Sequence, residues 1–157
     1  MDRTGTTALI LITAACVATA AAAPALESPG QAPATASAAP KNVWDGAFTE
    51  AQAARGQERY RTACSACHSE DLLGAAGPAL VGQAFVDRWT GSTAFDIVQT
   101  IRQTMPQEAP DSLGVPAYVD IASYILKSNG AAAGAEEMPA DHEALRRILV
   151  PSRGPSR

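Results

Sequence analysis

The sequence predicts an all-α protein. Three segments between Thr49 and Ser128 carry apolar residues at the three- and four-residue spacing of an amphipathic helix. Glycine, proline and asparagine punctuate the sequence between them, and no stretch has the two-residue alternation of a half-buried strand. The sequence contains no internal repeat. With 157 residues, the chain is short enough for one folded domain.

Residues 1–25 are predicted to be a secretory signal peptide. Thr6 to Ala23 is an uncharged run, mostly Ala, Leu, Ile and Thr, that leads into the A-x-A cleavage site Ala23-Pro24-Ala25. Cleavage predicts an exported, periplasmic protein with no membrane span. Two other interpretations stay open. The run is about as long as a minimal membrane span, so the leader could be retained as an anchor, or Cys16 could be a lipoprotein cysteine.

Residues 26–42 are predicted to be a disordered linker. They read LESPGQAPATASAAPKN, which is rich in Ala, Pro and Ser and almost free of large apolar side chains. Such a composition cannot bury enough apolar surface to offset the entropy of folding. Aromatic and patterned sequence begins at Val43, which sets the expected start of the folded domain.

The first helix is predicted from Thr49 to about Ala63. Thr49 and Gln52 have the spacing of a capping box, in which each residue satisfies a backbone donor of the other. Gly56 and Tyr60 then fall on the same face. A glycine is unfavourable in an isolated helix, but on a buried face it lets another backbone approach closely.

Two further helices are predicted over residues 92–104 and 115–128. The first has one apolar stripe and ends before Met105-Pro106, because the residue before a proline avoids helical geometry. The second has a strong apolar face and ends at Asn129-Gly130. The folded domain is therefore predicted to span residues 43–130.

Residues 131–157 are predicted to be a flexible C-terminal tail, because they are small, charged and proline-containing. The apolar content left between Val43 and Gly130 is thin for a free-standing core. Small domains of this kind commonly need a metal or cofactor to hold them together.

The chemistry is expected at Cys64-Ser65-Ala66-Cys67-His68. These residues match C-x-x-C-H, the pattern of c-type haem attachment. Two thiols three residues apart can reach two vinyl groups of one porphyrin and add across them to form thioethers. His68 then offers a neutral imidazole nitrogen to the iron as its proximal ligand. The sequence thus predicts one covalent haem c.

Other uses of the two cysteines fit less well. A thioredoxin-type redox pair belongs at the start of a helix in a βαβ setting, whereas Cys64 follows a predicted helix. A structural zinc site needs a second pair of ligands, and only His142 remains after the motif. A plain disulfide suits an oxidising compartment, but it leaves His68 without a role.

A second axial ligand is expected from the other side of the haem. The candidates are Met105, Met138 and His142. Met105 lies in a loop between two predicted helices and is followed by Pro106, whereas the other two lie in the predicted tail. The sequence therefore favours Met105 as the distal iron ligand. Ligation by His and Met raises the reduction potential of a haem.

The pattern from Ala51 to Gly130 resembles the class I c-type cytochromes, the monohaem cytochrome c family. The matching motifs, in order, are Gly56-x-x-x-Tyr60, Cys64-Ser65-Ala66-Cys67-His68, Gly77-Pro78-Ala79-Leu80, Thr104-Met105-Pro106 and Tyr118-x-x-x-Ala122-x-Tyr124-Ile125-Leu126. The resemblance implies the class I cytochrome c fold, with three to four helices wrapped around one covalently bound haem.

Several residue roles follow only from this resemblance. It implies that the Pro78 carbonyl accepts the N–H of the proximal His68, which would orient the ring and strengthen its other nitrogen as a ligand. It implies that Trp89 contacts the haem or one of its propionates, although Trp89 could equally be ordinary core. It also implies that the first and last helices cross near Gly56 and Tyr60.

The expected function is that of a periplasmic one-electron carrier rather than an enzyme. With His68 and Met105 both on the iron, no position is open for oxygen or peroxide. The alternatives are a cytochrome subunit or docking module of a periplasmic dehydrogenase or oxidase complex and, at greater distance, a haem enzyme or ligand sensor with an open iron site.

Redox proteins are the expected partners: a dehydrogenase, an oxidase or another cytochrome. The chain has 12 Lys and Arg against 16 Asp and Glu, which argues against nucleic-acid binding because that function needs a basic patch. The folded segment is itself net acidic, so charge steering would favour a basic partner surface. The protein is expected to be a monomer.

Overall fold

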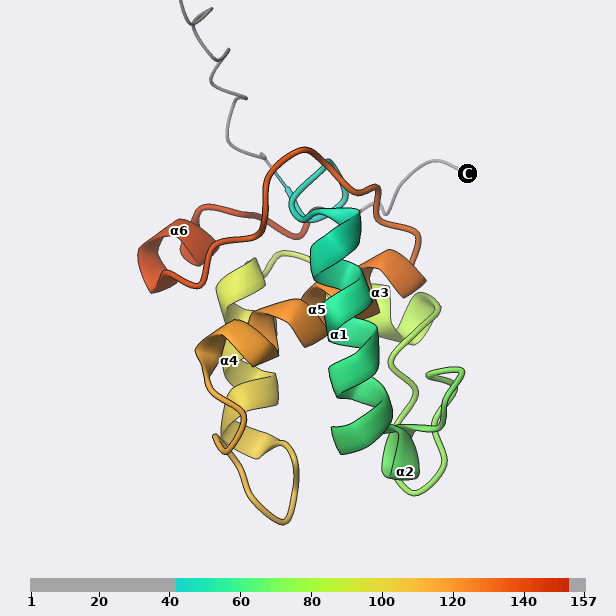
Figure 1. The fold of residues 1–157 in the computed structure, drawn as a ribbon. Helices are drawn as coiled ribbons and strands as arrows, with labels where there is room; N and C mark the ends of the chain where they lie inside the picture. The colour runs from blue at the N-terminus through green and yellow to red at the C-terminus, as the bar shows by residue number, and fades with distance from the viewer. Residues whose placement is uncertain (1–41, 153–157) are drawn as a thin grey trace, which may run out of the picture. The chain divides into compact units, whose positions relative to one another are not determined.

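The computed structural model describes residues 42–152 and contains six helices within them (Figure 1). They are α1 (Glu50–Ala63), α2 (Ser65–His68), α3 (Gln83–Trp89), α4 (Ala94–Thr104), α5 (Val115–Ser128) and α6 (His142–Arg146). The all-α class is confirmed, and the three predicted helices correspond to α1, α4 and α5. The predicted signal peptide, Cys16 and all of the predicted linker except Asn42 lie outside the described residues.

Helices α1 and α5 cross in close contact at Gly56. A Cβ built on Gly56 would lie 1.9 Å from the backbone oxygen of Asp120, so only glycine allows this approach. Beside the crossing, the buried Asp120 carboxylate accepts hydrogen bonds from Arg55 at 3.1 and 3.2 Å and from Arg59 at 3.3 Å. The rings of Tyr60 and Tyr124 pack 5.3 Å apart on the same interface.

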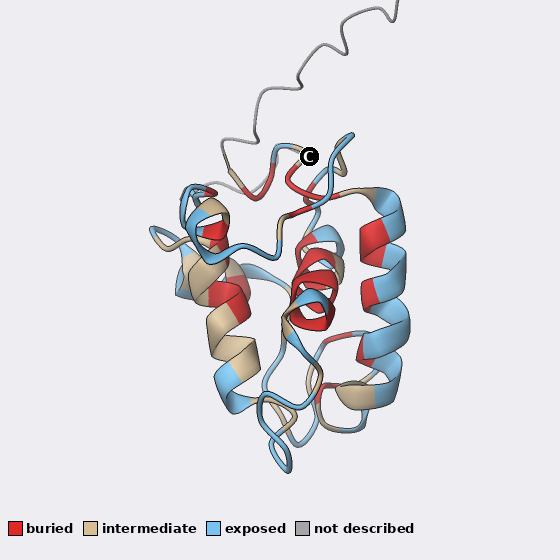
Figure 2. Ribbon diagram, turned by 60° about the vertical axis from the view of Figure 1, so that its left-hand side comes forward, coloured by how far each residue is buried: buried red, intermediate tan, exposed pale blue. Residues whose placement is uncertain are grey.

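Helix α5 forms the centre of the core, and burial is concentrated on it in Figure 2. Its buried side chains face both α1 and α4, whereas α1 is buried along one side only. None of the helices between residues 42 and 152 is long and apolar enough to cross a membrane.

The start of α1 differs from the predicted capping box in one respect. Thr49 is the N-cap, and its side chain accepts the Gln52 backbone N–H at 3.1 Å, as expected. The Gln52 side chain does not return to Thr49. It is buried and bonds the backbone of Met138 twice, donating to its carbonyl at 3.0 Å and accepting from its N–H at 2.7 Å.

The C-terminal segment contradicts the prediction of a flexible tail over residues 131–150. Four of its larger side chains are buried in the core: Met138, Leu145, Ile148 and Val150. Its backbone bonds the segment before α1, with the Val43 N–H 2.8 Å from the Leu149 carbonyl, and the segment before α4, with the Ala94 N–H 2.9 Å from the Ile148 carbonyl. These apolar residues add to the core that residues 43–130 form.

Candidate cofactor site

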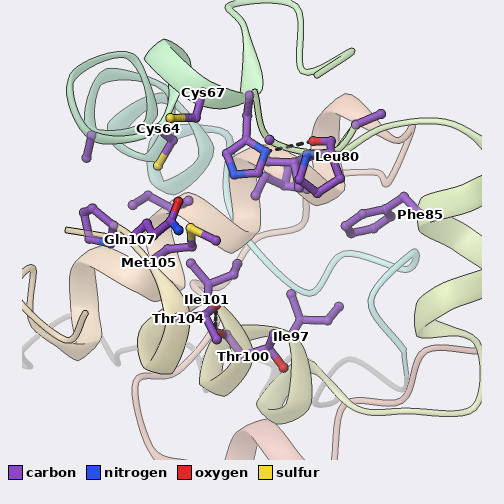
Figure 3. Close-up of a pocket in the computed structure, with 18 of the residues that line it drawn as sticks. Cys64, Cys67, Leu80, Phe85, Ile97, Thr100, Ile101, Thr104, Met105 and Gln107 are labelled. Atoms are coloured by element: carbon purple, nitrogen blue, oxygen red, sulfur yellow. Dashed lines mark hydrogen bonds between the residues drawn. The ribbon is translucent and has the colours of Figure 1, made fainter. Parts of the chain in front are cut away.

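Cys64, Cys67 and His68 lie where α1 ends and the chain turns into the short helix α2. The Cys64 carbonyl accepts from the N–H groups of both Cys67, at 3.2 Å, and His68, at 3.0 Å. This turn brings all three side chains to one cavity (Figure 3). Both cysteines are half-buried and free, so their thiols remain available for another bond.

The His68 imidazole is held from one edge by Pro78. The ring nitrogen Nδ1 lies 2.8 Å from the Pro78 carbonyl oxygen. A carbonyl can only accept, so Nδ1 carries the proton and Nε2 keeps a free lone pair. The ring is buried and lines the cavity. His68 is therefore oriented as a metal-ligating histidine is, with its second nitrogen engaged by the protein.

Gly77 makes room for this imidazole. A Cβ at Gly77 would lie 2.8 Å from Cε1, 2.9 Å from Nδ1 and 3.1 Å from Nε2 of His68. The Gly77 N–H also bonds the Cys67 carbonyl at 2.8 Å, which ties this loop to the attachment motif. A larger residue here would displace either the ring or the loop.

Met105 lines the same cavity from the C-terminal end of α4. Its backbone N–H bonds the Ile101 carbonyl at 2.8 Å, and its own carbonyl accepts the Tyr118 hydroxyl at 2.9 Å. In Figure 3 the Met105 side chain lies near Ile101 and Thr104, and Cys64 and Cys67 project from α2 and the turn before it. One thioether, two thiols and one imidazole thus share one cavity.

The other two candidate ligands lie elsewhere. Met138 is buried in the core beside Gln52. His142 lies on α6, where its ring packs edge-on against Phe95 with the centroids 5.2 Å apart. Neither residue lines the cavity. Of the three candidates in the sequence, only Met105 lines the same cavity as His68.

The cavity measures about 720 Å³, within the usual range for cofactor sites. Its walls are mostly apolar, with Leu80, Phe85, Ile97, Ile101, Ile121 and Ile125 among them. Trp89 also lines it and is half-buried, with its ring 6.3 Å from that of Phe85. Arg88 lines the cavity as well, and its guanidinium lies 5.2 Å from the Trp89 ring.

The burial of the Cys64 thiol disfavours its use as a metal-binding thiolate. Burial raises the pKa of the Cys64 thiol to about 11, so it stays protonated near neutral pH. Zinc is bound by thiolates, usually with four protein ligands. Within residues 42–152 no cluster of three or more His, Cys, Asp or Glu side chains could hold a metal ion. The donor set fits a haem, and the described residues form no zinc site.

Two contributors to the site have roles that the sequence did not predict. Gly77 was part of a recognised motif, but its contact with the His68 ring depends on how the loop folds back. Tyr118 was expected only as part of the apolar face of α5, and its hydroxyl contact with Met105 depends on the path of the loop between α4 and α5. No local pattern in the sequence signals either contact.

Comparisons with known proteins place the site in a wider context. Residues 51–125 match the sequence model of a family described as cytochrome C oxidase, cbb3-type, subunit III. A solved structure of the sulfane dehydrogenase SoxCD from Paracoccus pantotrophus is 21% identical, with a TM-score of 0.45. The match covers 63% of this chain and 53% of the matched SoxCD chain. This chain therefore spans about half of the length of the chain that it matches. A search of curated proteins found no match.

Proposed function

We propose that this chain, a class I c-type cytochrome that carries electrons, binds one haem c with His68 and Met105 as the two axial ligands. Cys64 and Cys67 would hold the group through thioether bonds, His68 would ligate through Nε2 and Met105 through its sulfur. When bound, the haem would supply reversible one-electron oxidation and reduction at its iron. The observation that carries the proposal is the shared cavity of these four side chains.

The residues around the cavity are suited to electron transfer without substrate chemistry. Pro78 holds His68 by its 2.8 Å contact at Nδ1, so the ring needs little rearrangement when charge changes nearby. The walls of the cavity are mostly apolar, which favours an apolar group such as a porphyrin over water. With ligands from both His68 and Met105 there is no open position for oxygen or peroxide, which supports a carrier rather than an enzyme.

We further propose that the carrier works outside the cytoplasm as a monomer and exchanges electrons with redox proteins. The leader-like residues 1–25 support export. The matched family is described as an oxidase subunit, which supports the second candidate, a cytochrome subunit or docking module of a larger enzyme. The two candidates share the same site and differ in whether the protein leaves its partner between turnovers.

The ligand assignment is tested by Met105→Leu, with Met138→Leu as the matched control. Replacing the thioether at position 105 should lower the reduction potential, since the sulfur favours reduced iron. Met138→Leu keeps the core volume, should destabilise the fold by less than about 1.5 kcal/mol, and should leave the potential unchanged. Redox titration measures both. A potential that moves with Met138 and not with Met105 would sink the assignment.

The number of haems and the fate of the leader are tested together by the intact mass of the exported protein. We expect the mass of the chain from Leu26 onward plus one covalent haem. A mass that includes residues 1–25 would mean that the leader is retained and not cleaved. A mass with no covalent haem, or with two, would contradict the attachment proposed for Cys64 and Cys67.

A further inference from the structure

A single buried hydroxyl joins the two ends of the loop that carries Met105. Tyr118, on α5, is 0% exposed. Its hydroxyl donates to the Met105 carbonyl at 2.9 Å and accepts the Leu113 N–H at 3.4 Å. The loop between α4 and α5 is thus pinned at its first residue and near its last by one side chain from the core.

The loop is also tied to Arg102 of α4, by the Asp111 N–H, which donates to the Arg102 carbonyl at 2.9 Å, and by an ion pair, and neither of these contacts holds Met105 itself. The Arg102 guanidinium pairs with the Asp111 carboxylate, with Nη2 and Oδ2 2.7 Å apart. The Asp111 side chain is 52% exposed and that of Arg102 is 26% exposed. An exposed ion pair stabilises little, because water and salt screen it. The Tyr118 hydroxyl belongs to a buried side chain, so its bond is less screened, and its loss leaves the Met105 carbonyl without this partner.

We propose that Tyr118 is the positioning residue for the distal ligand, an inference that rests on the assignment of Met105 proposed above. The Met105 backbone is fixed on both sides, its N–H by Ile101 at 2.8 Å and its carbonyl by Tyr118. A movement of the loop that carries the sulfur out of the cavity would break the bond between the Tyr118 hydroxyl and the Met105 carbonyl. The hydroxyl therefore opposes release and keeps the thioether in the cavity.

The test is imidazole binding to the oxidised, haem-loaded protein. Imidazole competes with the Met105 sulfur, so its apparent affinity reports the fraction of molecules in which the sulfur is released. Tyr118→Phe keeps the ring and removes only the hydroxyl. We expect imidazole to bind about 2- to 12-fold more tightly, the range that the loss of one typical hydrogen bond gives. The sulfur-to-iron absorption band should weaken in parallel.

Tyr60→Phe is the matched control. Tyr60 is also 0% exposed, and its hydroxyl donates to a backbone carbonyl, that of Ser69, at 2.6 Å. This variant should lower the thermal stability in the same way as Tyr118→Phe but should leave imidazole affinity within about twofold of the unmodified protein. Equal tightening in both variants would mean that Tyr118 acts only through general stability, which would overturn the positioning role.

Failure of this proposal can be told apart from failure of the ligand assignment. Met105→Leu should bind imidazole more tightly than either tyrosine variant, because it has no sulfur to displace. If Met105→Leu binds imidazole no more tightly than the unmodified protein, the assignment of Met105 fails and the role of Tyr118 fails with it. If Met105→Leu tightens binding and Tyr118→Phe does not, only the role of Tyr118 fails.

Discussion

Gly77 shows how closely one residue can control the place of His68, the side chain that we propose as a haem ligand. Its missing side chain is the space in which the His68 ring lies, with three ring atoms within 3.1 Å of where a Cβ would be. Pro78, the next residue, holds the ring by its Nδ1. A single dipeptide therefore sets both the place and the protonation pattern of the imidazole.

Gly77→Ala should disturb ligation by His68. Forcing a methyl group into this contact should destabilise the haem-loaded protein by about 1–3 kcal/mol, the usual range for overpacking, and should raise the high-spin fraction in the absorption spectrum. Chemical denaturation and the spectrum measure the two effects.

Gly91→Ala is the control for backbone strain. Gly91 has a φ of +84°, and nothing lies within 4 Å of where its Cβ would be, so alanine there should strain the backbone without touching the imidazole. The role of Gly77 would be contradicted if both variants kept the same spectrum.

At the scale of single residues, the sequence was informative where chemistry is local. Cys64, Cys67 and His68 are adjacent in the chain, so their spacing alone indicated a covalent haem. Met105 could be ranked above Met138 and His142 by its place between helices, and it is the one that lines the cavity. The hydroxyl of Tyr118 was not predictable, because its partner lies 13 residues away across a loop whose path no local pattern specifies.

At the scale of helices, the crossing of α1 and α5 positions the attachment motif. The motif follows directly on α1, so the angle and depth at which α1 packs on α5 place Cys64 and His68 relative to the cavity. Gly56 determines that depth through its contact with the Asp120 backbone.

Gly56→Ala should therefore unfold far more easily, although alanine is the better helix former by about 1 kcal/mol. A Cβ 1.9 Å from a backbone oxygen cannot be relieved by turning a side chain, so the helices must separate. We expect a loss of about 3 kcal/mol or more in urea denaturation, at or above the upper end for overpacking. Gln57 is exposed on the same helix. The free energy of unfolding of Gln57→Ala should therefore stay within about 0.5 kcal/mol of that of the unmodified protein. A Gly56→Ala variant as stable as the Gln57→Ala variant would contradict the crossing.

Helix positions were predictable and helix partners were less so. Thr49 and Thr93 are residue types that favour helix starts, and each lies directly before the helix that it caps. Thr49 is the N-cap of α1, and Thr93 is the N-cap of α4. The Gln52 side chain was predicted to bond the nearby Thr49, but in the structure it bonds the distant backbone of Met138. Leaving the buried Met138 N–H and carbonyl without partners would cost more free energy than the loss of one capping bond at the half-buried Thr49.

At the scale of the whole domain, the C-terminal segment completes the core. Met138, Leu145, Ile148 and Val150 are spaced too irregularly to mark a helix or a strand, which is why the sequence pattern predicted a tail. Burial of such side chains contributes about 1.5–3 kcal/mol each. The apolar content of residues 43–130 is thin, as the sequence indicates, but part of the missing core lies further along the chain.

Leu145→Ala and Leu149→Ala form a matched pair for this segment. Leu145 is 0% exposed, so its truncation to alanine should lower the free energy of unfolding by about 2–5 kcal/mol. Leu149 is 55% exposed, so its truncation to alanine should lower the free energy of unfolding by about 0.5 kcal/mol or less. Thermal or urea unfolding of the two variants measures the difference. Equal, small losses would mean that the segment is a tail after all.

We propose that His68 and Met105 would both ligate the iron of a bound haem, so that the protein would carry electrons with no position open for a substrate. Carbon monoxide added to the reduced protein checks this ligation, because carbon monoxide binds reduced haem iron only where a position is open. We expect the absorption spectrum of the unmodified protein to stay unchanged on addition of carbon monoxide, whereas Met105→Leu should form an adduct. Rapid and complete adduct formation by the unmodified protein would contradict it.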